Sequence, residues 1–266
     1  MTTAALAKGP GKMEEALRTR RDGGAKLLVP YVMAGMTADW VLTLQAVAAA
    51  GADAIEVGLP FSDPMMDGPV IQAAGIAALR RGTTVHGALD QLAAAELGIP
   101  IAVMTYYNLV FRAGHRRFAR SLAEAGVTGA IVPDLSLEEL DPWAAAADWG
   151  GIETVLMVAP STPPARVAAV AARSRGFLYA VSRMGVTGER VALGDAAARV
   201  VQRAREASDL PICCGIGIST PDQAREVCAV ADGVVVGSAL VRRLLEGAGP
   251  EGAAEFVGEL RGALGP

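Results

Sequence analysis

Hydrophobic and polar positions follow a two-part pattern that repeats along the chain from residue 27 onward. A short β-branched apolar run ends in Gly, Pro or Asp and is followed by an Ala-rich stretch with helical spacing, which is the pattern of a βα unit. The pattern predicts eight strands, at Leu27–Gly35, Asp53–Pro60, Ile99–Asn108, Gly129–Asp134, Glu153–Pro160, Phe177–Arg183, Pro211–Ser219 and Asp232–Ser238.

The stretches between these strands are each long enough for a helix of about three turns. Capping signals support two of the helix starts, since Ser136 precedes two glutamates and Thr220 precedes Pro221. A further helix is expected to begin near Val70, and Glu14–Arg21 is predicted as an extra helix that closes the bottom of the fold. The predicted helices between the strands are Asp39–Ala50, Thr84–Leu97, Arg116–Ala125, Leu137–Trp149, Pro164–Arg173, Asp195–Ala207 and Pro221–Val230.

The regular alternation predicts a parallel sheet, and eight units without a long interruption favour a closed (βα)8 TIM barrel over an open doubly wound sheet. We therefore expect a single barrel domain over residues 1–266, with residues 1–11 flexible. A Rossmann fold, the main alternative, requires GxGxxG directly after the first strand. That strand ends in Met33–Met36 (MAGM), which lacks the fingerprint.

Composition and charge narrow the class of protein. With 52% hydrophobic and 20% charged residues over 266 positions, the chain is not disordered and suits strands that are buried on both faces. The net charge is -4 and the basic residues are scattered or paired, so no basic stripe can follow a nucleic-acid backbone. The N-terminus has no apolar signal region, and no stretch offers about 18 uninterrupted apolar residues. We therefore expect a cytoplasmic protein that binds neither nucleic acid nor membrane.

The three cysteines, Cys213, Cys214 and Cys228, are predicted to be reduced packing residues, because the first two lie in an apolar run typical of a buried strand. The chain has two histidines, His86 and His115, and no CxxC motif. A Cys/His metal site would require residues from distant segments to converge, so no metal is expected.

Glu56 is the first candidate for chemistry, because active sites of this fold form at the C-terminal ends of the strands. Side chains alternate along a strand, so Ile55 and Val57 face the helices while Glu56 points into the barrel beside Ala54 and Gly58. Burial of an unpaired charge is costly, so Glu56 is expected to have a raised pKa or a substrate-facing position, and both suit proton transfer near neutral pH. The alternative is a structural glutamate bonded to backbone or water.

The loop after this strand, Phe61–Pro69 (FSDPMMDGP), is rich in Pro, Asp and Gly, which predicts fixed turns before the next helix. Asp67 is placed to reach over the barrel mouth toward a substrate. Asp63, which precedes Pro64, is equally suited to form a turn with its own backbone. Turn chemistry alone identifies neither aspartate as catalytic.

Glycine-bearing loops follow three neighbouring strands on the other side of the predicted barrel. Gly185–Gly188 (GVTG), Gly215–Ser219 (GIGIS) and Val236–Ser238 (VGS) follow the sixth, seventh and eighth strands. Glycine lets backbone N–H groups approach a phosphate, and the loops after strands seven and eight form the usual phosphate site of this fold. The sequence therefore predicts a phosphate site, and the alternative is that these glycines only ease helix packing.

The contiguous segment Ile55–Pro64 (IEVGLPFSDP), followed by Asp67–Pro69 (DGP), resembles the signature of the tryptophan synthase alpha subunit family. Further similar segments, in family order over nearly the whole chain from the first strand onward, are YYNLV at 106–110, VPDL at 132–135, YAVSR at 179–183, GVTG at 185–188, GIGIS at 215–219 and GSA at 237–239. The resemblance implies a barrel that cleaves indole-3-glycerol phosphate to indole and glyceraldehyde 3-phosphate. It also implies no cofactor in this chain, and a partner beta subunit that holds pyridoxal phosphate, in an α2β2 heterotetramer.

By motif position, the resemblance implies that Glu56 is the catalytic glutamate, that Asp67 is the catalytic aspartate and that Tyr179 lies in the active site. The implied phosphate-binding residues are Gly188, Gly217, Gly237 and Ser238. The expected walls for the apolar indole are Tyr31, Phe61, Met104 and Tyr106. Thr187 is expected to touch Asp67 when the segment after Arg183 closes over the substrate.

The implied reaction requires two such carboxylates. It needs a proton on indole C3, removal of a proton from the hydroxyl on the adjacent glycerol carbon, and stabilisation of the positive charge that develops at the indole N–H. Glu56 can perform the two proton transfers in turn, while an ionised Asp67 accepts the N–H hydrogen bond.

Three positions depart from the family pattern. Met36 stands where the family commonly has Asp-Pro after this glycine, Met66 replaces a small alanine before the catalytic aspartate, and Ser136 replaces a frequent proline. The family uses the loops after strands two and four against its beta partner, so these departures bear on partner affinity. The alternatives are a free-standing lyase of the same family, a non-catalytic subunit that binds the phosphate to switch a partner, and a different phosphate-binding barrel such as an isomerase.

Overall fold

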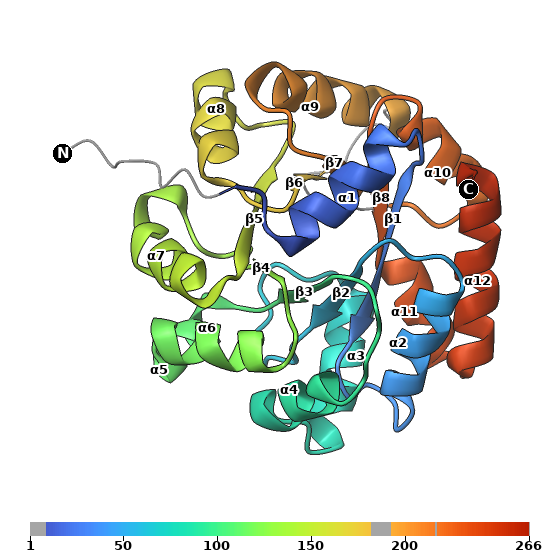
Figure 1. The fold of residues 1–266 in the computed structure, drawn as a ribbon. Coiled ribbons are helices and arrows are strands. Elements are labelled where there is room, and N and C mark those ends of the chain that lie inside the picture. Colours follow the sequence, from blue (N-terminus) through green and yellow to red (C-terminus); the bar gives the residue numbers. More distant parts are fainter. Residues whose placement is uncertain (1–8, 182–192, 216, 266) are drawn as a thin grey trace.

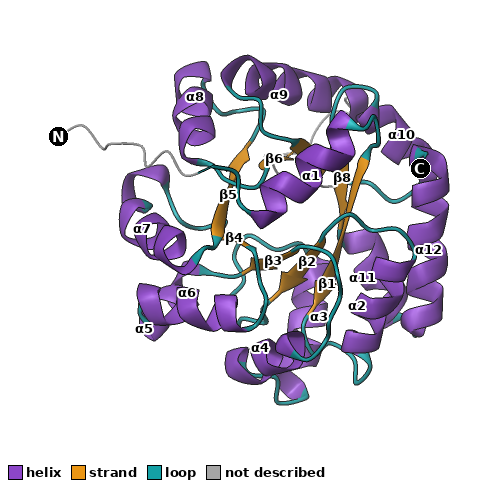
Figure 2. Ribbon diagram, in the orientation of Figure 1, coloured by secondary structure: helices purple, strands orange, loops and turns teal. Residues whose placement is uncertain are grey.

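Eight parallel strands close into a barrel at the centre of the molecule, and helices surround it (Figures 1 and 2). The computed structural model describes residues 9–181, 193–215 and 217–265. The strands are neighbours in chain order, and the first pairs with the last to close the barrel. They are β1 (Leu27–Met33), β2 (Ile55–Gly58), β3 (Ile101–Met104), β4 (Gly129–Ile131), β5 (Glu153–Val158), β6 (Leu178–Val181), β7 (Ile212–Gly215) and β8 (Gly233–Val236).

The helices lie on the outside of the barrel, except for α1, which crosses one end of it in Figure 1. They are α1 (Lys12–Asp22), α2 (Trp40–Ala49), α3 (Pro69–Arg80), α4 (Val85–Ala93), α5 (Tyr107–Ala113), α6 (His115–Glu124), the 3₁₀ helix η1 (Leu137–Glu139), α7 (Asp141–Gly150), α8 (Pro164–Arg173), α9 (Leu193–Ala207), α10 (Pro221–Cys228), α11 (Ser238–Leu245) and α12 (Gly249–Leu264). The predicted closed (βα)8 barrel with an extra N-terminal helix is confirmed.

Each predicted strand is present within its predicted range, but several predicted ends lie too far along the chain; the seventh strand, for example, was extended to Ser219, whereas β7 ends at Gly215. The third strand was extended to Asn108, whereas β3 ends at Met104 and α5 already begins at Tyr107. The Asp134 carboxylate, from the loop after β4, accepts the Tyr107 N–H at 2.9 Å and so satisfies a donor at the start of α5. A helix start that depends on a distant carboxylate gives no local signal in the sequence.

Several helical regions also differ from the prediction. The predicted helix Leu137–Trp149 is divided into η1 and α7, and α7 starts next to a proline, which suits the first turn of a helix. The predictions omit α5, α11 and α12, and α12 packs against α2 on the outside of the barrel. The expected flexibility of the N-terminus falls mostly on residues 1–8, which lie outside the described residues.

The bottom of the barrel is closed by α1. Met13 and Leu17 are fully buried and pack in an interior cluster with Leu27 and Phe177. The Glu153 carboxylate accepts the Met13 N–H at 2.7 Å and a second N–H from the same helical turn at 3.0 Å. This side chain therefore acts as a cap for the N-terminus of α1, and it ties the helix to β5.

The predicted faces of β2 are confirmed. Ala54, which precedes the strand, packs in the interior cluster, whereas Ile55 and Val57 pack in the second cluster, between strands and helices. Glu56 and Gly58 therefore share the interior face with Ala54.

Among the described residues, no helix is both long and apolar enough to cross a membrane.

Candidate active site

Glu56 lies inside the barrel and is only 1% exposed. Its backbone pairs with Tyr31 of β1 and Ala102 of β3, so its side chain has neighbouring strands on both sides. One carboxylate oxygen, Oε2, is buried without a hydrogen-bond partner among the described residues. Because buried polar atoms are nearly always paired, an unpaired oxygen in the barrel interior points to a group kept free for a ligand.

The electrostatic environment of Glu56 favours its protonated form. Burial raises the pKa of Glu56 from 4.5 to about 8, and the negative charge of Asp67 adds to the rise. The carboxyl therefore holds its proton at neutral pH and is close enough to its titration point to act both as an acid and as a base. The alternative of a structural glutamate bonded to backbone describes Glu153 instead, whose two oxygens each accept an N–H.

Two glycines make room for phenol side chains near Glu56. A Cβ on Gly58 would overlap the Tyr31 hydroxyl, and a Cβ on Gly215 would overlap the Tyr179 hydroxyl. Both tyrosines are buried, and burial together with the charge of Glu56 raises the pKa of each phenol well above its ordinary value. Tyr31 and Tyr179 are thus neutral neighbours of the buried carboxyl, in the positions predicted for the site.

Asp67 lies near Glu56, at the end of the loop between β2 and α3. Burial raises the pKa of Asp67 from 3.8 to about 6, and a hydrogen bond from the Tyr106 hydroxyl opposes the rise. Asp63, the other aspartate in the loop, is exposed and accepts a hydrogen bond at 2.5 Å from the neighbouring Ser62 hydroxyl. The structure therefore separates the two aspartates that turn chemistry left equivalent.

Aromatic and apolar side chains line the same end of the barrel. The rings of Phe61 and Tyr106 stack with centroids 5.1 Å apart and an interplanar angle of 24°. Met104 is half-buried at the end of β3 and contacts the interior cluster. Met157 of β5 was missed by the sequence predictions, although it is a half-buried neighbour of this cluster and pairs with Tyr179. The alternation of interior positions along β5 would have identified it.

The predicted phosphate residues divide between described and undescribed parts of the chain. Gly217 has a φ of 90°, a conformation that favours glycine. Gly237 is the N-cap of α11 and Ser238 is its first residue, so free N–H groups of the first helical turn are available there. Thr187 and Gly188, together with the expected closing segment, lie outside the described residues.

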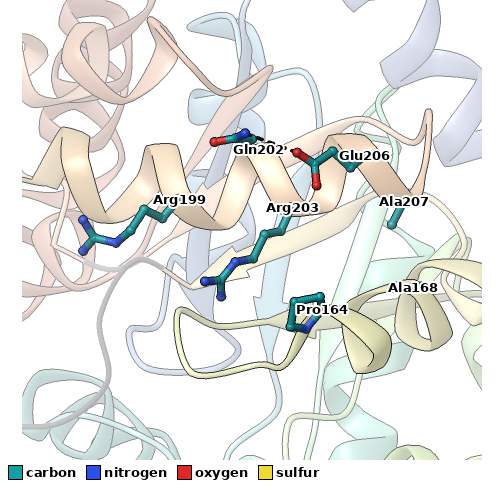
Figure 3. Close-up of a pocket in the computed structure, with 7 residues that line it drawn as sticks. All are labelled: Pro164, Ala168, Arg199, Gln202, Arg203, Glu206 and Ala207. Atoms are coloured by element: carbon teal, nitrogen blue, oxygen red, sulfur yellow. Dashed lines mark hydrogen bonds between the residues drawn. The ribbon is translucent and has the colours of Figure 1, made fainter.

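A surface pocket of about 440 Å³ lies away from these residues, between α8 and α9 (Figure 3). Arg199 and Arg203 of α9 extend toward it, with Pro164 of α8 on the opposite side. Arg203 donates to the backbone carbonyl of Pro160 at 3.2 Å, so part of its guanidinium is used within the chain. None of the predicted site residues lines this pocket.

The cysteines and potential metal ligands give no second site. Cys213, Cys214 and Cys228 are buried and free, and burial raises the pKa of each thiol. Within the described ranges, no group of three or more His, Cys, Asp or Glu side chains could hold a metal ion.

The closed barrel defines the class of protein, a (βα)8 barrel, and the two carboxyl groups of raised pKa at one end of it make that end the candidate active site. Residues 17–260 match the family model of the tryptophan synthase alpha chain. The tryptophan synthase alpha chain of Streptomyces avermitilis is 43% identical over 269 residues, covering 98% of this chain and 97% of that protein. That of Thermobifida fusca is 47% identical over 229 residues, covering 84% of this chain and 85% of that protein.

Solved structures give the same result. A structure of Mycobacterium tuberculosis tryptophan synthase matches with a TM-score of 0.89 and 40% identity, covering 96% of this chain and 99% of that one. The tryptophan synthase alpha chain of Legionella pneumophila matches with a TM-score of 0.87 and 29% identity, covering 96% of this chain and 98% of that one. The chain belongs to the tryptophan synthase alpha chain family, whose members are lyases that cleave indole-3-glycerol phosphate in tryptophan biosynthesis.

Proposed function

We propose that this chain performs the cleavage with Glu56 as both acid and base and with Asp67 as the partner of the indole nitrogen. The observation that carries the proposal is the buried Glu56 carboxyl, which has one oxygen without a hydrogen-bond partner among the described residues and a pKa raised to about 8 near a second carboxylate. Burial of a carboxyl group without a full set of hydrogen bonds is costly, and a subunit that only bound phosphate would not require such a group.

In the proposed reaction, protonated Glu56 first gives its proton to indole C3. The resulting carboxylate then takes the proton of the hydroxyl on the adjacent glycerol carbon. As that O–H electron pair forms the aldehyde C=O bond, the bond between the glycerol carbon and C3 breaks, and its electrons restore the aromatic indole. Glu56 ends protonated as it began, so one residue near its titration point suffices for both transfers.

Asp67 has a different task because its pKa is lower. With a pKa of about 6, it is mainly ionised at neutral pH while Glu56 is not. An ionised carboxylate at the mouth can accept the indole N–H and stabilise the positive charge that develops when C3 is protonated. Each of the two roles contributes roughly 3 to 5 kcal/mol of transition-state stabilisation.

The rest of the substrate is assigned to the surrounding residues. The indole would lie against Tyr31, Phe61, Met104 and Tyr106, with Tyr179 beside Glu56. The phosphate would bind at Gly217, Gly237 and Ser238, together with Gly188. Thr187 would contact Asp67; Gly188 and Thr187 both lie outside the described residues.

We further propose that the chain is a single cytoplasmic barrel domain without its own cofactor, and that it works with a beta subunit in an α2β2 heterotetramer that holds pyridoxal phosphate. The resemblance to tryptophan synthase structures supports this partner. Met65 and Met66 are 80% and 59% exposed, and both lie in the loop that carries Asp67. This exposed apolar surface suits a protein partner at the barrel mouth.

The test is indole release from indole-3-glycerol phosphate by the purified chain, first alone and then with a beta subunit. We expect slow release alone and faster release with the partner. The variants Glu56→Gln and Asp67→Asn should each lose activity while retaining the fold. Asp63→Asn is the matched control in the assay of the chain alone, because Asp63 is exposed and its hydrogen bonds to described residues lie within its own loop.

No release under either condition would refute the proposed reaction. Strong release from the chain alone, unchanged by a beta subunit, would favour the free-standing lyase. Full activity in Glu56→Gln would overturn the assignment of the proton transfers to this side chain.

A further inference from the structure

Tyr106 contacts both ends of the loop that carries Asp67. Its ring stacks on Phe61, the third residue after β2, and its hydroxyl accepts the Met66 N–H at 3.0 Å. The residues from Phe61 to Asp67 are therefore held at two points by one side chain from the end of β3. Tyr106 is 3% exposed, whereas Met66 is 59% exposed, so the ring is shielded from solvent and the hydrogen bond to Met66 is partly buried.

The Tyr106 hydroxyl uses its acceptor and its donor for neighbouring residues of this loop. While the oxygen accepts the Met66 N–H, the hydroxyl also interacts with the Asp67 carboxylate and lowers its pKa against the effect of burial. Burial raises the pKa of Tyr106 to about 12, so the phenol keeps the proton that it donates over the whole physiological range. A hydrogen bond of this kind favours the ionised form of Asp67 over the protonated form.

The backbone beside Tyr106 is itself fixed by a carboxylate from the loop after β4. The Tyr107 N–H donates to both oxygens of the Asp134 carboxylate, at 2.9 and 3.2 Å. Tyr106 is the N-cap residue of α5, so this contact fixes the backbone from which the Tyr106 side chain extends. The other hydrogen bonds of the loop to described residues are short-range, such as the Asp67 N–H to the Pro64 carbonyl at 3.2 Å, and these set its turns and not its distance from the barrel.

We propose that Tyr106 is a positioning residue, and not only a wall of the indole site: its hydroxyl holds the Met66 backbone and the Asp67 carboxylate together, so that Asp67 faces the substrate in its ionised form. The inference rests on the proposed role of Asp67 and adds the group that acts through it. Phenylalanine at this position would keep the ring and the stacking but remove both hydrogen bonds.

The test compares Tyr106→Phe with Tyr107→Phe in the full-length chain. Tyr107→Phe is the matched control, because it removes a hydroxyl from the adjacent residue, whose partner is His115 at 3.0 Å. Amide hydrogen exchange at Met66 and a carbon-13 titration of the Asp67 carboxyl, both by NMR, need no substrate. In Tyr106→Phe we expect exchange at Met66 to be about tenfold faster or more. The pKa of Asp67 should rise above its wild-type value, because the lost hydrogen bond lowered it.

The kinetic measurement is the dependence of kcat/KM on pH. In Tyr106→Phe the acid limb should move to higher pH, and kcat/KM at neutral pH should fall about tenfold, as expected for one lost hydrogen bond to a charged group. A wall residue that only packs would change KM without moving the acid limb. Tyr107→Phe should match the wild-type protein in all three measurements.

Unchanged exchange at Met66 and an unchanged Asp67 pKa in Tyr106→Phe would overturn the inference, as would equal effects in both variants. The NMR result also separates this inference from the proposed function. If the NMR changes appear while no protein cleaves indole-3-glycerol phosphate, the positioning by Tyr106 holds and the reaction assignment fails.

Discussion

Replacement of Glu56 by glutamine should abolish the proton transfers. It should also raise the free energy of unfolding relative to the wild-type protein, by an amount that grows as the pH rises. The Glu56 carboxyl is 1% exposed and its pKa is raised from 4.5 to about 8. Below pH 4.5 both the folded and the unfolded protein hold this proton. Above that pH the unfolded chain releases it, whereas the folded protein keeps it until about pH 8.

The sign and size of the effect follow from this difference in bound protons. Because the folded state binds more protons than the unfolded state between pH 4.5 and about 8, the contribution of Glu56 to stability falls as the pH rises through this range. At 1.36 kcal/mol for each pKa unit, the full shift corresponds to about 5 kcal/mol. Glutamine is close in size and stays neutral, so Glu56→Gln avoids this loss. Relative to wild type, the variant should gain about 1, 3 and 5 kcal/mol at pH 5, 7 and 9.

The assay is urea unfolding of both proteins at these three pH values, with the free energies of unfolding compared at equal m-values. Glu124→Gln, which changes an exposed glutamate on α6, is the control and should follow the wild-type protein throughout. Parallel stability curves for wild type and Glu56→Gln between pH 5 and 9 would refute the claim that burial holds this carboxyl in its protonated form.

Three further outcomes are expected. In Asp67→Asn, kcat/KM should fall by about 10² to 10³, since an amide cannot stabilise the charge at the indole nitrogen, and wild-type thermal unfolding would show that the fold is intact. The kcat/KM of the wild-type protein should fall below about pH 6, as Asp67 is protonated, and above about pH 8, as Glu56 ionises; a flat profile from pH 5 to 9 would contradict the assignment. Glu153→Gln should lower the free energy of unfolding by about 1 to 3 kcal/mol, because glutamine can accept only one of the two N–H groups of α1 at this cap, and an unchanged urea midpoint would exclude the capping role.

The strands and Glu56 were predictable because each depends on a local pattern. Parallel strands that are buried on both faces produce apolar runs, and every predicted run contains a strand. On β2 the period of two was enough to place Glu56 inside and Ile55 outside, and the packing of Ile55 between strands and helices, with Ala54 in the interior cluster, confirms it. The raised pKa of the glutamate follows from that burial, so its direction was predictable from the sequence as well.

The features that the sequence pattern missed depend on contacts between distant segments. Asp67 and Asp63 have similar surroundings in the sequence, but in space Asp67 is partly buried near Glu56 and the Tyr106 hydroxyl, about 40 residues away, whereas Asp63 is exposed. The start of α5 depends in the same way on Asp134, which is 27 residues away in the chain. The family resemblance identified Asp67 by motif position, but it gave no physical reason for the choice.

Glu56 and Glu153 show that burial alone does not make a carboxylate a candidate for catalysis. Both are almost fully buried, at 1% and 3% exposure, and both lie on strands of the same barrel. The Glu153 oxygens each accept an N–H from α1, so this group is satisfied and contributes to closing the bottom of the barrel. With Met13 and Leu17 filling that end, the interior below Glu56 is apolar and closed, which maintains the desolvation that raises the pKa of Glu56. The structural glutamate thus supports the environment on which the proposed catalytic glutamate depends.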